Sequence, residues 1–244
     1  MENTYYFIIV GVLLFEYALS TISSTLNMNS ITEDIPDGFQ DYYDKDKYAK
    51  SQSYLKDKTR FGLFTGTFSL CITLVIIHAG LFGLLDDFVR AHSNHYITSG
   101  LLFFGTLFIL NDIINLPFSI YGTFVIEEKY GFNKTTWKTF VSDKFKGYGL
   151  TIVLGSAVMV PLLYFFEAYG SNGWWIAWAL ITGFMIAIQP LFVHVIAPMF
   201  NKFEPLDNEE FKKPIEKLLK KVDFKSKGLF VMDASLRSTH GNAF

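Results

Sequence analysis

Charged residues are scarce in this 244-residue sequence, where Lys, Arg, Asp and Glu make up 18% of all positions, against about 25% in an average soluble protein. This composition argues against intrinsic disorder and against most freely soluble folds. Neither sign of charge is in excess, since 21 basic residues stand against 23 acidic ones, so we expect no nucleic acid as a partner. The single cysteine, Cys71, excludes an intrachain disulfide and therefore a secreted disulfide scaffold.

Long uncharged runs take the place of the missing charges, and they are rich in aliphatic residues and in the 26 phenylalanines. A helix needs about 20 apolar residues to cross the hydrocarbon core of a bilayer. The charged residues inside the runs are Glu16 in the first and Asp112 in the third. We therefore predict an all-α polytopic membrane protein with five transmembrane helices, one in each of the segments 3–26, 61–85, 97–126, 147–166 and 168–201.

Basic residues gather on one side of these five segments. The loops 27–60 and 127–146 hold six and five of them and the segment 201–244 holds nine, whereas the loop between the second and third spans holds Arg90 alone. The positive-inside rule places the three basic segments in the cytoplasm, so we expect a cytoplasmic C-terminus and an N-terminus outside or in a lumen. Three tryptophans at the start of the fifth span fit an outer aromatic belt: Trp174, Trp175 and Trp178.

Polar residues cluster inside the third span. Asn111, Asp112 and Asn115 lie at helical spacing, together with Ser119, and Pro117 permits a kink between them. Polar groups at membrane depth face protein or water. The cluster therefore either makes hydrogen bonds between helices or lines a water-filled chamber or substrate path.

Isolated polar residues elsewhere carry weaker signals. We expect Glu16, His78, Gln189 and His194 to make single contacts between helices. A metal site in the outer loop, from Asp86, Asp87, His92 and His95, is less favoured than solvated side chains, because no helical pairing fixes these four residues. Asn133 and Thr135 form a glycosylation sequon on the cytoplasmic side, so we interpret them as turn and helix-capping groups.

The cytoplasmic segments show helical and strand patterns. Charges of both signs between 41 and 60 predict an amphipathic helix that leads into the second span. Further on, Asp207 or Asn208 is expected to cap a helix, with Pro214 shifting the cap toward Glu210 or making the first turn irregular. A strand is predicted at 228–234. One helix and one strand cannot bury a core, so 201–244 reads as the unfinished start of a soluble domain.

Four motifs in chain order resemble the type I CAAX prenyl endopeptidase family of integral membrane zinc metalloproteases. They are YAKSQSYLKDKTRF at 48–61, PFSIYGTFVIEEKYGFNK at 117–134, IAPMFNKFEPL at 196–206 and SLRSTHGNA at 235–243. The resemblance implies a five-span membrane domain at 1–200, with cytoplasmic loops 27–60 and 127–146. It also implies that 201–244 begins an α+β zinc-metallopeptidase domain. The helices of such proteins enclose a chamber, which Asn111, Asp112 and Asn115 would line.

The zinc motif of that family is absent from this sequence. Zinc is held there by an H-E-x-x-H helix and a distal Glu, whereas none of the five histidines here lies four residues from another or precedes a Glu. We therefore expect no metal ligands and no catalytic residues in these 244 residues. The resemblance implies substrate-pairing or supporting roles for Arg237, His240, Asn242 and Ala243, and ordinary strand and turn chemistry is the alternative.

The sequence thus predicts the N-terminal membrane portion of a zinc metalloendopeptidase, inactive without its catalytic domain. The resemblance implies that the full-length form cleaves prenylated C-terminal peptides or membrane proteins. It implies the endoplasmic reticulum for a eukaryotic chain and the cytoplasmic membrane for a bacterial one. One alternative is a non-catalytic scaffold or a binder of lipidated peptides, and another is a small transporter that uses Asp112.

Overall fold

Five helices long and apolar enough to cross a bilayer make up most of the fold. They are seen in a computed structural model that describes residues 4–226, 228–233 and 237–239. The predicted number of spans is confirmed, with helical segments at Thr4–Asn29, Lys45–His78, Tyr96–Glu127, Trp137–Tyr169 and Trp174–Phe200. The chain divides into two compact units, Met1–Asn133 and Lys134–Phe244.

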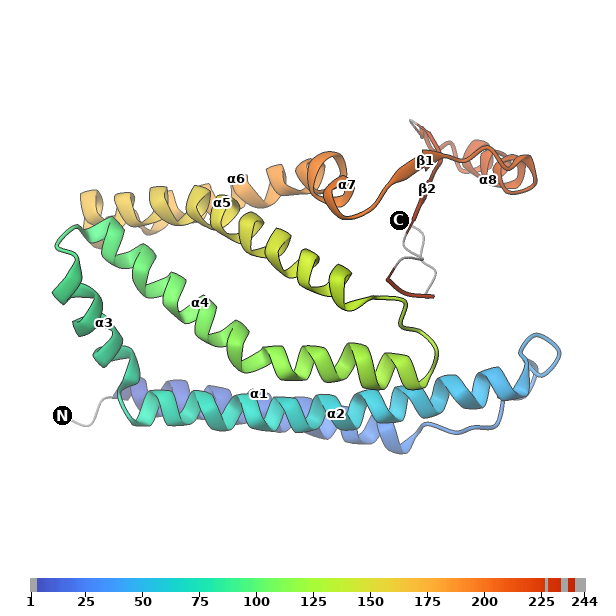
Figure 1. Cartoon of the computed structure of the whole chain (residues 1–244), viewed down its shortest axis with the longest axis horizontal. Helices are drawn as coiled ribbons and strands as arrows, with labels where there is room; N and C mark the ends of the chain where they lie inside the picture. Colours follow the sequence, from blue (N-terminus) through green and yellow to red (C-terminus); the bar gives the residue numbers. More distant parts are fainter. Residues whose placement is uncertain (1–3, 227, 234–236, 240–244) are drawn as a thin grey trace. The chain divides into compact units, whose positions relative to one another are not determined.

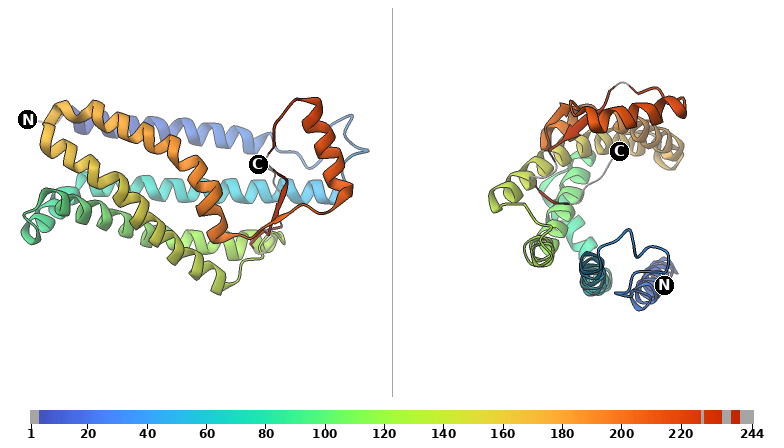
Figure 2. Two further views of the ribbon diagram at one scale, coloured as in Figure 1. Left: turned by 90° about the horizontal axis from the view of Figure 1, so that it is seen from above. Right: turned by 90° about the vertical axis from the view of Figure 1, so that its right-hand side faces the viewer.

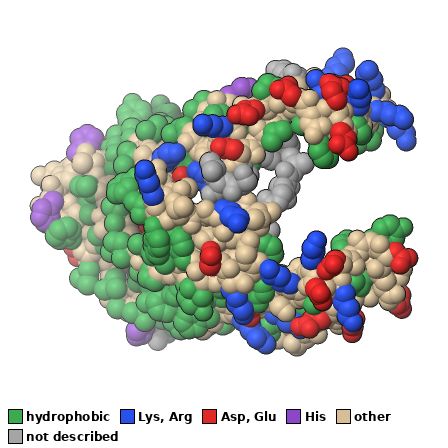
Figure 3. Space-filling model, turned by 45° about the vertical axis from the view of Figure 1, so that its right-hand side comes forward, with side chains coloured by type: hydrophobic (Ala, Val, Ile, Leu, Met, Phe, Trp, Pro, Cys, Tyr) green, Lys and Arg blue, Asp and Glu red, His purple; other side chains and the backbone are tan. Residues whose placement is uncertain are grey.

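The spans expose their apolar side chains rather than bury them. In the most hydrophobic window of each span, at most 6% of the residues are buried. A water-soluble helix buries an apolar stripe against its neighbours, which these helices do not. Figure 3 shows a broad zone of hydrophobic side chains on one face, with charged side chains gathered apart from it. Lipid therefore supplies the apolar surroundings of the five spans, and the protein is an integral membrane protein.

In the first unit, α1 (Thr4–Asn29) and α2 (Lys45–His78) lie side by side and antiparallel (Figures 1 and 2). The Asp44 side chain accepts a hydrogen bond of 2.9 Å from the Lys47 amide, which caps the start of α2. From that cap the helix continues without a break from the charged segment into the membrane segment. The predicted helix leading into the second span is thus confirmed.

The second span ends earlier than the run of uncharged residues. Gly80 has φ +67°, a left-handed conformation that only glycine adopts readily, and it separates α2 from a short helix, α3 (Leu81–His92). The predicted span at 61–85 is therefore wrong at its end, and the expected loop with Arg90 is a helix. Apolar composition continues across the break, so the charge count does not register it.

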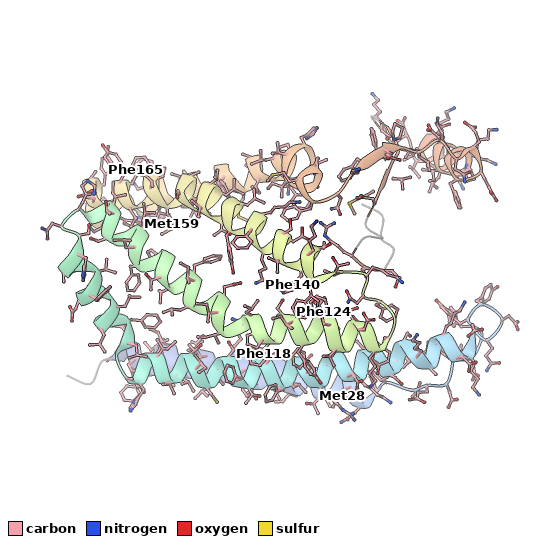
Figure 4. All side chains as sticks on the ribbon, viewed as in Figure 1. Met28, Phe118, Phe124, Phe140, Met159 and Phe165 are labelled. Atoms are coloured by element: carbon pink, nitrogen blue, oxygen red, sulfur yellow. The ribbon has the colours of Figure 1, made fainter. Side chains whose placement is uncertain are left out.

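The third span begins at α4 (Tyr96–Tyr121) and ends in η1 (Gly122–Glu127), a π-helical turn. Its predicted bounds agree within one residue at each end. Phe118 follows Pro117 and points toward α2 (Figure 4). Its ring centroid lies 6.3, 6.1 and 5.0 Å from those of Phe61, Phe64 and Phe68. Such edge-to-face contacts pack the third span against the second.

The second unit holds the fourth and fifth spans. The fourth is α5 (Trp137–Tyr169). The 3₁₀ turn η2 (Gly170–Gly173) leads to the fifth, which comprises α6 (Trp174–Leu191), the π-helical turn η3 (Phe192–Ile196) and α7 (Ala197–Phe200). As predicted, Trp174 opens the fifth span. The cap of α5 is Thr136, whose hydroxyl accepts from the Thr139 amide at 3.2 Å. The capping role expected for Thr135 is therefore wrong.

A two-stranded sheet and one helix follow the fifth span. Strand β1 (Phe203–Pro205) pairs antiparallel with β2 (Phe230–Met232), and Phe203 lies opposite Met232. Between them lies α8 (Glu209–Lys221), which Asn208 caps by accepting from the Glu210 amide at 2.9 Å. The predicted shift of this cap toward Glu210 is wrong, because Asn208 is the cap and the helix continues through Pro214. The predicted strand is shorter than expected, and β1 was not anticipated.

Candidate functional site

Two of the polar residues of the third span, Asn111 and Asn115, bond to each other along their own helix. The Asn115 side-chain amide donates to the backbone oxygen of Asn111 at 2.8 Å and to its side-chain oxygen at 3.0 Å. The cost of placing this amide at membrane depth is thereby lowered without a second helix. The chamber-lining role of Asn111, Asp112 and Asn115 stays a prediction.

The isolated histidines divide into two kinds. His78 of α2 lies 3.3 Å from the Tyr6 hydroxyl of α1, which confirms the predicted contact between helices. His194 Nδ1 lies 2.8 Å from the backbone oxygen of Pro190, one turn earlier on the same helix, so the contact predicted for it is satisfied locally instead.

The acidic and histidine side chains after the second span do not converge on a metal site. Asp86 accepts from Arg90 at 2.8 Å, and His92 Nδ1 lies 2.7 Å from the Phe88 backbone oxygen. Across the described residues, no group of three or more His, Cys, Asp or Glu side chains could hold a metal ion. The described part of the chain therefore does not fit zinc, and we derive no catalytic step through it.

A first polar cluster lies where α2 meets the end of the third span, and we call it the α2–η1 cluster. Its members are two tyrosines, two lysines and two carboxylates: Tyr54, Asp57, Lys58, Glu127, Lys129 and Tyr130. The Tyr54 hydroxyl donates to the Glu127 carboxylate and accepts from Lys58 at 3.1 Å. Asp57 in turn accepts from Lys129 at 2.6 Å and from the Tyr130 hydroxyl at 2.7 Å. Each carboxylate is thus held by groups on the other of the two sequence segments.

The α2–η1 cluster combines a buried ring with exposed ammonium groups. Tyr130 is only 7% exposed, and burial, followed by its bond to Asp57, raises the pKa of its hydroxyl. The Lys129 side chain is 61% exposed, and its hydrogen bond to Asp57 raises its pKa. After the cluster, Gly131 turns the chain at φ +71°. Since both carboxylates of the cluster are held from the opposite segment, the cluster suits fastening α2 to the end of the third span.

A second polar cluster forms in the other unit around Arg237, and we call it the Arg237 junction. Its side chains are those of Thr135, Asp143, Asn201 and Arg237. The guanidinium donates to both oxygens of Asp143, from Nε at 2.7 Å and from Nη2 at 3.0 Å. Nη1 donates to the Asn201 side-chain oxygen at 2.9 Å. Such a planar fork on a carboxylate is a strong, direction-specific contact.

The backbone of Arg237 is held as firmly as its side chain. Its carbonyl oxygen accepts from the Lys134 amide at 3.0 Å and from the Thr135 hydroxyl at 3.1 Å. The side chains of Arg237 and Asp143 are only 25% and 23% exposed. The hydrogen bond to Asp143 raises the pKa of Arg237, so the guanidinium stays charged. Thr135, expected to serve as a cap, instead fixes this carbonyl.

Neighbouring contacts bind the same three segments together. The Lys146 ammonium, one turn after Asp143 on α5, donates to the Met199 carbonyl at the end of the fifth span at 2.9 Å. The Lys202 amide donates to the Asp233 carboxylate at 2.7 Å, and the Asp233 amide donates to the Lys202 backbone oxygen at 3.1 Å. The start of the fourth span, the end of the fifth and the segment after β2 thus meet at this place.

The structure places only part of the predicted substrate segment. Arg237 is described, whereas His240, Asn242 and Ala243 lie outside the described residues. The partners Asp143 and Asn201 were not singled out from the sequence. Asn201 belongs to the motif at 196–206, and that membership is the one sequence signal that could have pointed to it.

Comparison with known proteins gives consistent matches. The model of a family described as CAAX prenyl protease N-terminal, five membrane helices, matches residues 4–202. The chain is 38% identical over 217 residues to the probable CAAX prenyl protease 1 of Schizosaccharomyces pombe, covering 84% of this chain and 46% of that protein. It is 33% identical over 220 residues to CAAX prenyl protease 1 of Saccharomyces cerevisiae, covering 86% and 49%.

A solved structure agrees with these sequence matches. The crystal structure of S. mikatae Ste24p is similar with a TM-score of 0.88 at 29% identity, and the match covers 99% of this chain and 58% of that one. The chain therefore spans about half the length of the curated relatives it matches.

Proposed function

Because the chain belongs to the family of CAAX prenyl protease N-terminal regions with five membrane helices, we propose that it supplies the membrane part of a protease of this type. The protein is a CAAX prenyl protease-like membrane protein. The observation that carries the proposal is the match of all five spans, residues 4–202, to one family. In the proposed reaction, prenylated C-terminal peptides or membrane proteins are cleaved within a chamber of membrane helices.

Each group of candidate residues has its own part in this proposal. Asn111, Asp112 and Asn115 line the chamber, whose water would solvate them. The stretch Asn242–Ala243 pairs with the extended peptide as an added strand, and Arg237 and His240 have supporting roles beside it. Backbone pairing of this kind binds peptides of varied sequence, because the contacts are to main-chain groups.

The chemistry of cleavage requires residues beyond these 244. Zinc, which the family implies, would activate the attacking water. The described side chains form no group that could hold it, and the sequence contains no H-E-x-x-H pattern. We propose that the chain is inactive alone and that a catalytic domain supplies the zinc ligands. A transcript that encodes H-E-x-x-H in frame would favour this proposal over a non-catalytic scaffold or binder of lipidated peptides.

The proposed topology places the C-terminal segment in the cytoplasm and the N-terminus in the lumen. Support comes from the 20 basic residues on one side of the spans. The relatives are eukaryotic, so we propose the endoplasmic reticulum as the compartment. A reporter fused after Phe244 should be active on the cytoplasmic face only, and activity only on the lumenal face would refute this topology.

Metal content and peptide binding of the purified chain test the proposal together. We expect far less than one zinc per chain by mass spectrometry and no cleavage of a farnesylated CAAX peptide. We also expect the chain to bind that peptide, and the same peptide without its farnesyl group to bind less tightly. One tightly bound zinc per chain, or cleavage of the peptide, would refute the proposal that the chain is an inactive membrane part. Equal affinity for the two peptides would argue against a lipidated substrate.

A further inference from the structure

Arg237 has the chemistry of a group that contacts substrate, but its surroundings indicate another use. Three of its nitrogen atoms already donate to Asp143 and Asn201. We propose that Asp143 and Asn201 are positioning residues: through Arg237 they hold the segment 237–239 against the start of the fourth span and the end of the fifth. The proposal rests on the proposed function in one respect, that the residues after this segment pair with peptide.

The shape of the guanidinium explains why arginine stands at this position. Two parallel hydrogen bonds to Asp143 set the plane of the fork, and the third bond, to Asn201, then points along a fixed direction. A lysine ammonium has the same charge but no plane, so it cannot keep both partners in this geometry. These bonds use three of the five N–H donors of the guanidinium, including both that form the fork on Asp143, so a substrate anion could not take the fork without displacing Asp143. The geometry therefore favours holding the segment over contact with the reacting atoms.

Both ends of Arg237 are fastened to one short stretch of chain. Its side chain bonds to Asp143 in the second turn of α5, and its carbonyl bonds to Lys134 and Thr135 just before that helix. Because Arg237 is held through backbone and side chain together, its rotation or sliding would break several hydrogen bonds at once. The segment 237–239 therefore keeps its register relative to the start of the fourth span.

This anchoring has a consequence for the residues that follow. A chain advances at most about 3.6 Å per residue. Asn242 is five positions beyond Arg237, so its distance from the anchor cannot exceed about 18 Å. Loss of the anchor would widen the volume these residues explore and would weaken peptide pairing through lost preorganisation. Asn201 further ties the anchor to the C-terminal end of the fifth span.

Amide hydrogen exchange on the full chain in lipid nanodiscs tests the proposal without any substrate. The Lys134 amide reports directly, because it donates to the Arg237 carbonyl. We expect its exchange to speed up about tenfold in Asp143→Asn, since hydrogen bonds to charged groups are worth more than neutral ones. A smaller increase is expected in Asn201→Ala and in Arg237→Lys, which retains the charge.

Lys146→Met is the matched control, because it removes a contact between α5 and the end of the fifth span that does not involve Arg237. It should leave exchange at Lys134 unchanged. Unchanged exchange at Lys134 in Asp143→Asn would overturn the proposal, as would an equal increase in Lys146→Met. Exchange in the middle of α5 shows whether each variant is folded.

Binding of the farnesylated peptide separates positioning from general stability. We expect Asp143→Asn to weaken binding about tenfold while Lys146→Met does not, and the exchanged pair Asp143→Arg with Arg237→Asp to recover part of the loss. Normal binding by Asp143→Asn would overturn the positioning role. Absence of binding by the unmodified chain would count against the proposed function, and the exchange result would then decide the positioning role by itself.

Discussion

The α2–η1 cluster and the Arg237 junction are built from similar groups but distribute their hydrogen bonds and ion pairs differently over the side chains. In the α2–η1 cluster, each of two carboxylates is held by a tyrosine and by a lysine. In the Arg237 junction, a single guanidinium serves both partners and a single carbonyl accepts two donors. The first arrangement shares its contacts among several side chains, whereas the second concentrates them on one.

This difference has consequences for mutation and for function. Removing one tyrosine or one lysine of the α2–η1 cluster leaves each carboxylate with another partner, so the fastening of α2 to η1 should persist. Removing Arg237 takes three side-chain hydrogen bonds at once and leaves the half-buried Asp143 without its counter-charge. A shared arrangement suits a permanent fastening, and a concentrated one suits the exact placement of a single segment.

The largest effect is expected for Arg237→Met. The free energy of unfolding should fall by about 2 kcal/mol, because charged hydrogen bonds are lost and a partly buried carboxylate loses its partner. Arg237→Lys should lose less, since it restores the charge without the fork. Unfolding in mixed micelles, followed by helical circular dichroism, measures the change.

Lys138→Met serves as the control, since it removes one exposed positive charge from the first turn of α5. Its effect should be within about 0.5 kcal/mol, as for most surface substitutions. If Arg237→Met were no more destabilising than Lys138→Met, the contrast between concentrated and shared contacts would not hold.

How far the sequence predicts the fold depends on which physical signal is strong. Charge cannot be placed cheaply in hydrocarbon, so gaps in the charge pattern marked all five spans. The break at Gly80 left no trace in that pattern, because neither Lys, Arg, Asp nor Glu stands on either side of it between 61 and 85. Strand β1 was missed since three residues ending in Pro205 carry almost no periodicity.

The sequence indicated many of the residues in these two clusters, but it did not indicate which residues pair with each other. The motifs at 48–61 and 117–134 contain every member of the α2–η1 cluster, yet nothing in them tells that Asp57 pairs with Lys129, 72 residues away. Arg237 was identified by resemblance, whereas Asp143 lies 94 residues from it and Asn201 lies 36. Contacts over such separations are set by how helices pack, which one sequence does not show.

The smallest effect is expected for Lys129→Met, because the Tyr130 hydroxyl still donates to Asp57 and the lysine side chain is 61% exposed. Asp57 raises the pKa of Lys129 in the folded state. The stabilisation is therefore complete below the ordinary lysine pKa of about 10.4 and is lost as the pH rises through the raised value.

Melting temperatures of the unmodified chain and of Lys129→Met, measured from pH 7 to 11, report this effect as their difference. Tyr130 titrates in both proteins, and Lys129 lowers the pKa of its hydroxyl, so this coupling contributes to the difference at the upper end of the pH range. The difference in melting temperature should be small at pH 7 and should disappear as the pH rises above the ordinary lysine pKa. It should also shrink in 1 M salt, because the ion pair is exposed. Lys47→Met, in the first turn of α2, controls for loss of an exposed charge. A gap as large as that of Arg237→Met would mean that the α2–η1 cluster also depends on a single side chain.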